Sequence, residues 1–155
     1  MIDFSDLIRP DAVLPSLKAG SKKQVLQALA EKAAIVTGRD DRTILDLLVQ
    51  REKLGSTGVG GGVAIPHARL PGIDHIVGMF AHLAHPVDFE SLDEQPVDLV
   101  FLMLAPEAAG ADHLKALARI ARVLRDPVVV ARLRGSPDNA ALYAVLTEGA
   151  KPNAA

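Results

Sequence analysis

The stretch from Val97 to Leu104 constrains the fold more than any other part of the chain, because only Asp98 interrupts its apolar side chains. The run is far too short to cross a membrane, since a spanning helix needs about 20 apolar residues. A short, nearly continuous apolar run is typical of a strand that is covered on both faces. We therefore expect a sheet with helices packed against it.

Apolar periodicity predicts the remaining elements. Ser21 is expected to open a helix as its N-cap, with Gln24 three places later as in a capping box, and Gly38 is expected to close it. The further helices expected are Asp41–Lys53, Asp112–Arg125, and one that begins at Ser136-Pro137 and ends near Glu148. The further strands expected are Val63–Ile65 and His75–Leu83, whereas Val128–Leu133 fits either a strand or a short helix.

Helices alternate with strands, so the sequence predicts an α/β fold in which a mixed sheet is flanked by helices. A length of 155 residues suits one domain, which we place at residues 1–148, with a flexible tail at 149–155. Aromatic residues make up only 3% of the chain, so we expect a core of Leu, Val, Ile and Ala.

Composition excludes several classes of protein. The formal net charge of −2 argues against a nucleic-acid or general polyanion binder, and the absence of cysteine excludes disulfides and cysteine-bound zinc. The first six residues carry acids where a signal peptide carries bases, and no apolar segment follows them. We expect a cytoplasmic protein that does not insert into membranes.

The segment that leads to His67 has the chemistry of an anion site. No residue from Leu54 to Pro66 is charged, and five of them are glycine, among them Gly58 and Gly60. Successive backbone N–H groups in such a loop can bind an anion. Pro66 restricts the backbone before His67, and a neutral imidazole is a good phosphoryl acceptor.

Residues near this loop could complete a phosphoryl site. Arg51 could bind the phosphoryl oxygens with its planar guanidinium, and Ser56 and Thr57 could donate hydroxyl hydrogen bonds. From the spacing by itself, an ordinary glycine turn beside an unreactive histidine is the stronger alternative. No Gly-Lys-Ser/Thr follows the glycines as in a P-loop, and a strand follows them where a dinucleotide loop needs a helix.

The motif Arg51-Glu52, followed by Ser56-Thr57-Gly58-Val59-Gly60 and by Gly62-Val63-Ala64-Ile65-Pro66-His67, resembles the active-site signature of a known family. These are the IIA components of the phosphoenolpyruvate phosphotransferase system, of the mannitol/fructose type and, within it, the nitrogen-regulatory branch. The similarity extends over nearly the whole chain. It implies the mannitol/fructose IIA fold and reversible phosphorylation of His67, on Nε2, with no cofactor other than the phosphoryl group.

The resemblance also assigns roles to Arg51, as the active-site arginine, and to His113, as the second active-site histidine. His113 is expected in the first turn of a helix, where free N–H groups and the helix dipole favour an anion. The residues themselves would otherwise favour an exposed histidine of no consequence. We expect no metal site, because His82 and His85 would point to opposite faces of a strand and no metal-binding motif accompanies them.

The resemblance implies an HPr-like phosphocarrier, here called NPr, as the phosphoryl donor. It further implies regulatory targets such as potassium-transport or sensor-kinase proteins. A sugar-specific IIA that donates to a IIB domain, and an interaction module that has lost phosphotransfer, remain as alternatives. The Leu- and Ala-rich helices would permit a weak homodimer. A basic region follows His113, and either solvent or an acidic partner could cover it; its residues are Lys115, Arg119, Arg122, Arg125, Arg132 and Arg134.

Overall fold

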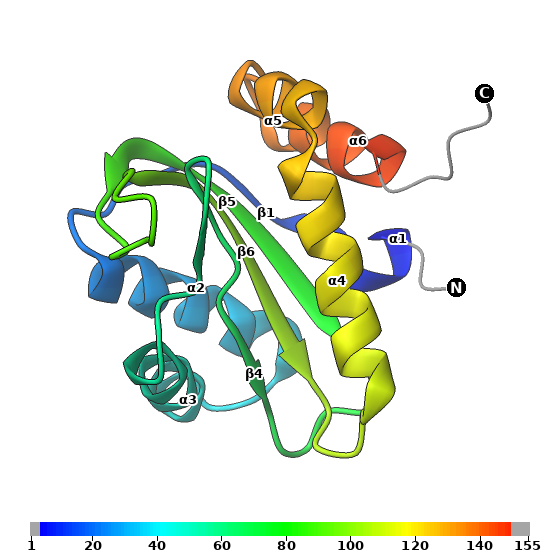
Figure 1. Ribbon diagram of the computed structural model, residues 1–155. Coiled ribbons are helices and arrows are strands. Elements are labelled where there is room, and N and C mark those ends of the chain that lie inside the picture. Colours follow the sequence, from blue (N-terminus) through cyan, green and yellow to red (C-terminus); the bar gives the residue numbers. More distant parts are fainter. Residues whose placement is uncertain (1–3, 150–155) are drawn as a thin grey trace.

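The computed structural model describes residues 4–149 as a mixed sheet between two groups of helices (Figure 1). The helices are α1 (Phe4–Leu7), α2 (Lys22–Thr37), α3 (Asp41–Lys53), α4 (Ala111–Arg125), α5 (Pro127–Arg134) and α6 (Asn139–Gly149). The strands are β1 (Ile8–Leu17), β2 (Gly58–Gly60), β3 (Val63–Ala64), β4 (His67–Arg69), β5 (Val77–Val87) and β6 (Val97–Ala105).

The strand β6 lies at the centre of the sheet, as its apolar sequence predicted. Every residue of β6 is buried except Asp98, which is partly exposed. The strand order is β1-β5-β6-β3-β2. β4 lies outside this order and pairs with the last residues of β6, whereas β3 pairs with the first half of the same strand. β6 runs antiparallel to β5 but parallel to β3 and β4, and β1 is parallel to β5, so the sheet is mixed as expected.

Helices cover both faces of this sheet. In Figure 1, α2 and α3 lie behind the strands, whereas α4 crosses in front and leads to α5 and α6. The core is largely Leu, Val, Ile and Ala, as predicted, but all four phenylalanines are also fully buried: Phe4, Phe80, Phe89 and Phe101. Phe101 of β6 contacts Phe4 and Phe80, with ring centroids 5.7 and 6.5 Å apart. The few aromatic side chains are therefore concentrated in the core.

Capping residues set the helix boundaries. Ser21 caps α2 by accepting from the Gln24 amide, and Gly38 ends the helix in the left-handed conformation, both as predicted. Residues 127–134 form α5, because Asp126 caps them and Pro127 occupies the first helical turn. The predicted start of the last helix at Ser136 was wrong. Asp138 accepts from the Ala141 amide instead, and α6 begins one residue later.

Two strands differ from the predictions. The strand expected from His75 begins at Val77 and continues to Val87. The strand β1 was not predicted at all. Of the predicted flexible tail, residues 150–155 lie outside the described residues. Among residues 4–149, no helix is long and apolar enough to span a bilayer.

Candidate functional site

The backbone around His67 is fixed by the centre of the sheet. His67 is the first residue of β4, which continues from β3 after Ile65 and Pro66. The Pro66 carbonyl accepts from the Met103 amide at 2.9 Å, and His67 lies beside Met103 in the parallel pair of β4 with β6. The imidazole therefore extends from a strand that is paired with the buried central strand β6.

The hydrogen bonds of His67 define its tautomer. Nδ1 lies 2.8 Å from the carbonyl oxygen of Ile65. Because a carbonyl can only accept, Nδ1 carries the proton and Nε2 is left with its lone pair. Nε2 faces Arg51, whose Nε donates to it across a long 3.4 Å. Nε2 is therefore the nitrogen available as a nucleophile.

The surroundings of His67 keep it neutral. Burial lowers the pKa of His67, and the positive charge of Arg51 lowers it further. The hydrogen bond to Ile65 and the charge of Glu52 oppose these effects without reversing them. A neutral imidazole is the form that can accept a phosphoryl group.

His113 lies beside His67, although 46 residues separate them in the chain. Their ring centroids are 5.8 Å apart with an edge-on angle of 72°. His113 projects from the first turn of α4 and is only 7% exposed. Its Nδ1 has no hydrogen-bond partner among the described residues. Burial, followed by the positive charge of Arg69 and the nearness of His67, lowers the pKa of His113.

Arg51 approaches the site from the last turn of α3. Besides Nε, which faces His67, its Nη1 donates to the Gly55 carbonyl at 2.8 Å. Arg51, Ser56, Thr57 and His67 line one cavity of about 350 Å³. The structure therefore brings four of the predicted residues to one cavity and places His113 beside it.

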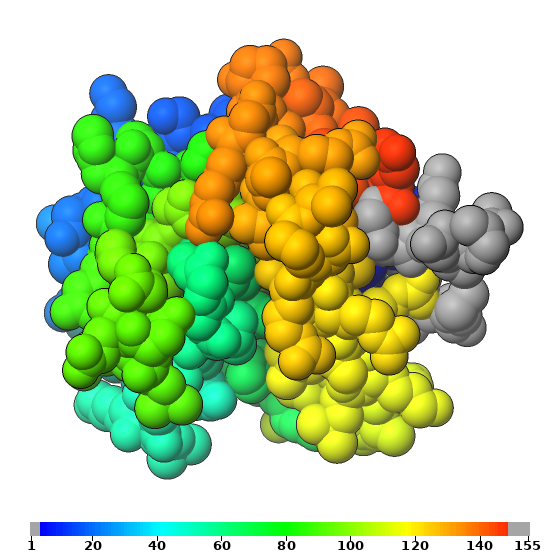
Figure 2. Space-filling view, turned by 45° about the horizontal axis from the view of Figure 1, so that its top comes forward, coloured from blue at the N-terminus to red at the C-terminus, as the bar shows by residue number. Residues whose placement is uncertain are grey.

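The far wall of this cavity is apolar, a feature that was not predicted. α4 contributes its Leu114, Leu117, Ala118 and Ala121 side chains, which face Val59 and Ile65. Leu114 and Val59 are 65% and 49% exposed, so the rim is apolar as well. Figure 2 shows the hollow between the β2–β3 segment and the column of α4.

The hydroxyls and glycine amides of the loop already have partners. Ser56 donates to the Phe89 carbonyl, and the Thr57 hydroxyl donates to Glu52. The Gly58 amide donates to the Ser56 hydroxyl at 3.0 Å, and the Gly61 amide donates to Asp93 at 2.9 Å. Here these groups shape the loop, and their predicted contacts with a phosphoryl group would require a local rearrangement.

Sequence reasoning gave no role to Glu52, which contacts the loop, or to Lys22, which pairs with Glu52. Glu52 accepts from Thr57 and from the Lys22 ammonium, the latter at 3.0 Å. Both are ordinary helix-surface residues in the sequence. The one available signal was the position of Glu52 next to Arg51. In the basic region, Arg134 binds Asp98 and Arg132 binds Glu148, so part of its charge is neutralised within the protein.

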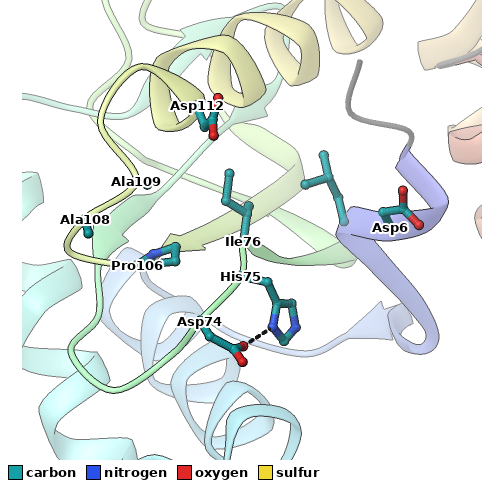
Figure 3. Close-up of a pocket in the computed structure, with 9 residues that line it drawn as sticks. Asp6, Asp74, His75, Ile76, Pro106, Ala108, Ala109 and Asp112 are labelled. Carbon is teal, nitrogen blue, oxygen red and sulfur yellow. Dashed lines mark hydrogen bonds and ion pairs between the residues drawn. The ribbon is translucent and has the colours of Figure 1, made fainter.

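A larger cavity, of about 530 Å³, lies on a different part of the surface (Figure 3). Asp6, Asp74 and Asp112 line it, and His75 makes a 2.6 Å contact with Asp74 at its edge. Three carboxylates make this cavity unsuitable for an anion. Across residues 4–149, no three His, Asp or Glu side chains come together in a way that could hold a metal ion.

The fold and the imidazole pair define an α/β protein of the phosphotransferase IIA class. Residues 6–149 match the family model described as the phosphoenolpyruvate-dependent sugar phosphotransferase system, EIIA 2. The chain belongs to this family.

Within the family, the chain is similar to nitrogen regulatory proteins. It is 62% identical to the nitrogen regulatory protein of Bradyrhizobium diazoefficiens over 143 residues, which is 92% of this chain and 94% of the relative. The crystal structure of the nitrogen regulatory protein IIA-Ntr from Neisseria meningitidis is 30% identical, with a TM-score of 0.88 over 93% of this chain and 99% of that one.

A third comparison bears on the fold. The crystal structure of IIA mannitol from Escherichia coli is 19% identical, with a TM-score of 0.73 over 89% of this chain and 97% of that chain. At this identity the likeness shows the fold only, and it confirms the predicted mannitol-type IIA architecture.

Proposed function

We propose that this protein is a reversible phosphohistidine carrier of the nitrogen-regulatory phosphotransferase system, with His67 as the acceptor. The observation that carries the proposal is the state of the His67 imidazole. Its Nδ1–H is bound to the Ile65 carbonyl, and its Nε2 lone pair faces Arg51 in an open cavity. This is a neutral nucleophile with a cationic partner beside it.

The transfer needs only residues of this chain and a phosphorylated donor. The Nε2 lone pair of His67 forms a bond to phosphorus while the bond from phosphorus to the donor imidazole breaks, and that imidazole leaves with the electron pair. Such a transfer depends on in-line positioning and charge stabilisation. Arg51 stabilises the phosphoryl oxygens, and His113 donates a hydrogen bond to one of them. Ser56, Thr57, Gly58 and Gly60 shape the loop and could add donors.

The surface around His67 suits a protein donor better than a small molecule. Val59 and Leu114 are large apolar side chains, each about half exposed or more, and they line the cavity. Leu54, which is also exposed, lies in the chain between Arg51 and Ser56 of the same cavity. Exposed apolar residues gathered around a reactive group are typical of a protein-binding surface. We assign the HPr-like phosphocarrier NPr as the partner that docks here, in the cytoplasm.

The output of the carrier is regulatory. A phosphoryl group would place close to two negative charges on a neutral site inside an apolar surface, which changes how any partner binds there. The similarity to nitrogen regulatory proteins supports this branch over a sugar-specific IIA. Targets such as potassium-transport or sensor-kinase proteins would then distinguish the phosphorylated from the unphosphorylated form.

The test is a reconstituted relay of phosphoenolpyruvate, a nitrogen-branch enzyme I, NPr and this protein. We expect the wild type to gain one acid-labile phosphoryl group by intact mass, and His67→Ala to gain none. His82→Ala, which alters a half-buried histidine of β5, is the matched control and should be labelled as the wild type is.

Two results would overturn the proposal. Transfer from a sugar-branch carrier but not from NPr would favour a sugar-specific IIA that donates to a IIB domain. Transfer from neither carrier would leave an interaction module without phosphotransfer.

A further inference from the structure

Glu52 is a buried carboxylate that the mechanism above does not use. Its side chain is only 6% exposed, although it lies in the last turn of a surface helix. It accepts from the Lys22 ammonium at 3.0 Å, from the Thr57 amide at 3.2 Å and from the Thr57 hydroxyl. A buried charge is destabilising unless it is paired and hydrogen-bonded, and these partners satisfy that requirement.

A chain of hydrogen bonds links Glu52 to the His67 imidazole. Thr57, held by Glu52, accepts from the Ile65 amide with its own carbonyl at 2.9 Å. The Ile65 carbonyl then accepts from Nδ1 of His67 at 2.8 Å. Each link joins the next through one residue, so Glu52 is connected to the acceptor for Nδ1 by two intervening residues, Thr57 and Ile65.

Arg51 completes the arrangement from the neighbouring position of α3. Its Nε faces Nε2 of His67, on the opposite edge of the same ring. Two consecutive residues of one helix turn therefore hold the imidazole from both sides. Lys22, which comes from α2 and also lies 5.5 Å from the Phe89 ring centroid, keeps the Glu52 carboxylate in place.

We propose that Glu52 is a positioning residue for phosphoryl transfer, which orients the His67 imidazole and fixes its Nδ1–H tautomer through Thr57 and Ile65. The inference rests on the proposed function, in which Nε2 of His67 accepts the phosphoryl group. Glu52 itself does not touch the reacting atoms.

The effect of Glu52 on the orientation of the His67 ring can be separated from the effect of its charge on the His67 pKa. The charge of Glu52 raises the pKa of His67, so its loss would lower that pKa. At pH 8 His67 is neutral with or without this charge. A lower transfer rate at pH 8 in a Glu52 variant therefore shows that the His67 ring is no longer well oriented. A shift of the acidic side of the pH–rate profile to lower pH shows instead that the charge of Glu52 has been lost.

The experiment compares Glu52→Gln and Glu52→Ala with Asp46→Asn, which removes an exposed carboxylate from the same helix. The rate of phosphorylation of His67 is measured from pH 5 to pH 8, both with phosphorylated NPr and with phosphoramidate as a small donor. We expect Glu52→Ala to lower the rate at pH 8 by about tenfold or more, with KM for NPr little changed. Glu52→Gln, which keeps one acceptor for Thr57, should lie between Glu52→Ala and the wild type.

A second measurement needs no donor. The tautomer of His67, read from two-bond ¹⁵N–¹H correlations by NMR, should be the Nδ1–H form in the wild type and in Asp46→Asn, and a mixture in Glu52→Ala. Thr57→Val keeps the amide hydrogen bond to Glu52 and loses the hydroxyl hydrogen bond, so it should show a smaller effect of the same kind. This variant tests the same chain of hydrogen bonds if Glu52→Ala does not fold.

The inference fails if folded Glu52 variants keep both the wild-type tautomer and the wild-type rate at pH 8. Failure of the proposed function looks different: NPr would not label the wild type, while phosphoramidate and the NMR measurement would still report on Glu52.

Discussion

At the scale of single residues, one guanidinium serves two acceptors. Arg51 donates from Nη1 to the Gly55 carbonyl and from Nε towards His67. The first bond fixes the side chain, so the second can be directed at the imidazole and at an incoming phosphoryl group. A lysine ammonium has the charge but not this fork of donors.

Arg51→Lys should therefore reduce phosphoryl transfer to His67 by about 100-fold, the usual effect of removing one preorganised donor from a transition state. The rate of transfer from NPr measures this, and an unchanged melting temperature would show that the fold is kept. Arg42→Lys, an exposed change near the start of the same helix, is the control. A rate within twofold of the wild type would mean that charge without the fork suffices.

His113 should change its protonation state when His67 is phosphorylated. Burial now lowers its pKa, and its Nδ1 is unpartnered. A doubly negative phosphoryl group on the neighbouring ring would favour the charged imidazole and raise the pKa of His113. NMR titration of the phosphorylated and unphosphorylated protein measures the shift, with the exposed His85 as internal reference. Equal His113 pKa values in the two forms would show that it does not contact the phosphoryl group.

The sequence predicted which residues form the site, but it did not predict the hydrogen bonds and ion pairs that position them. Arg51, His67 and His113 carry the resemblance, and the structure brings them together. Glu52 is part of the motif but could be given no role, because a glutamate in the last turn of a helix is usually solvated. Its burial depends on Lys22, 30 residues earlier in the chain. The directions of the Ser56 and Thr57 hydroxyls were equally open, since a hydroxyl turns to whichever acceptor the fold supplies.

At the scale of elements, the turn between β2 and β3 is anchored by α5. Arg134 of α5 donates to both Asp98 carboxylate oxygens at 2.8 Å and to the Gly61 carbonyl at 3.0 Å. This leaves no room at Gly62, where a Cβ would lie 2.4 Å from Nη2 of Arg134. Gly61 and Gly62 both have positive φ, but no atom lies within 4 Å of a Cβ at Gly61.

Gly62→Ala and Gly61→Ala therefore form a matched pair. Each adds the strain of a side chain at positive φ, about 1–2 kcal/mol, but only Gly62→Ala also displaces Arg134. We expect Gly62→Ala to lower the free energy of unfolding by at least about 1 kcal/mol more than Gly61→Ala, because a charge-assisted contact is lost as well. Urea denaturation gives both values. Equal losses would show that Arg134 can move aside without cost.

The prediction of elements failed where a strand contains proline. β1 carries Pro10 and Pro15, residues that argue against a central strand. The structure places β1 at the edge of the sheet, where within residues 4–149 it pairs only with β5 and its register is irregular. Val128–Leu133 was ambiguous because its valines favour a strand, and the cap at Asp126 decided for a helix. β2 and β4, of three residues each, are too short for periodicity to reveal. β3 lies within the strand expected at Val63–Ile65.

At the scale of the whole molecule, the sheet explains why one buried strand could predict the fold class. β6 contacts β3, β4 and β5, so both of its edges and both of its faces are covered. An apolar run reports this burial directly. The order of the strands could not be predicted, because it depends on which strand edges pair with each other and no local sequence pattern specifies this. The same limit holds for the site, since the distance between His67 and His113 depends on how α4 packs against the sheet.

The same packing makes the stability of the molecule depend on pH. Burial lowers the pKa values of His67 and His113 in the folded protein below the ordinary value of 6.5. Between the ordinary and the lowered values, the unfolded chain binds more protons than the folded one, so the free energy of unfolding falls as pH falls. The contribution of these histidines is fully present above pH 6.5 and is lost as the pH drops through the lowered values.

We therefore expect the protein to unfold at a lower urea concentration at pH 5 than at pH 8, and the double variant His67→Gln, His113→Gln to show a smaller difference. The groups that shape the His67 and His113 pKa values, Arg51, Glu52 and Arg69, are unchanged in this variant. The lowered carboxylate pKa values of Asp74 and Asp93 act only in more acidic solution, because their ordinary value is 3.8. If the double variant loses as much stability between pH 8 and pH 5 as the wild type, the two site histidines are not held neutral by the fold, and the nucleophile would have to be prepared by its donor instead.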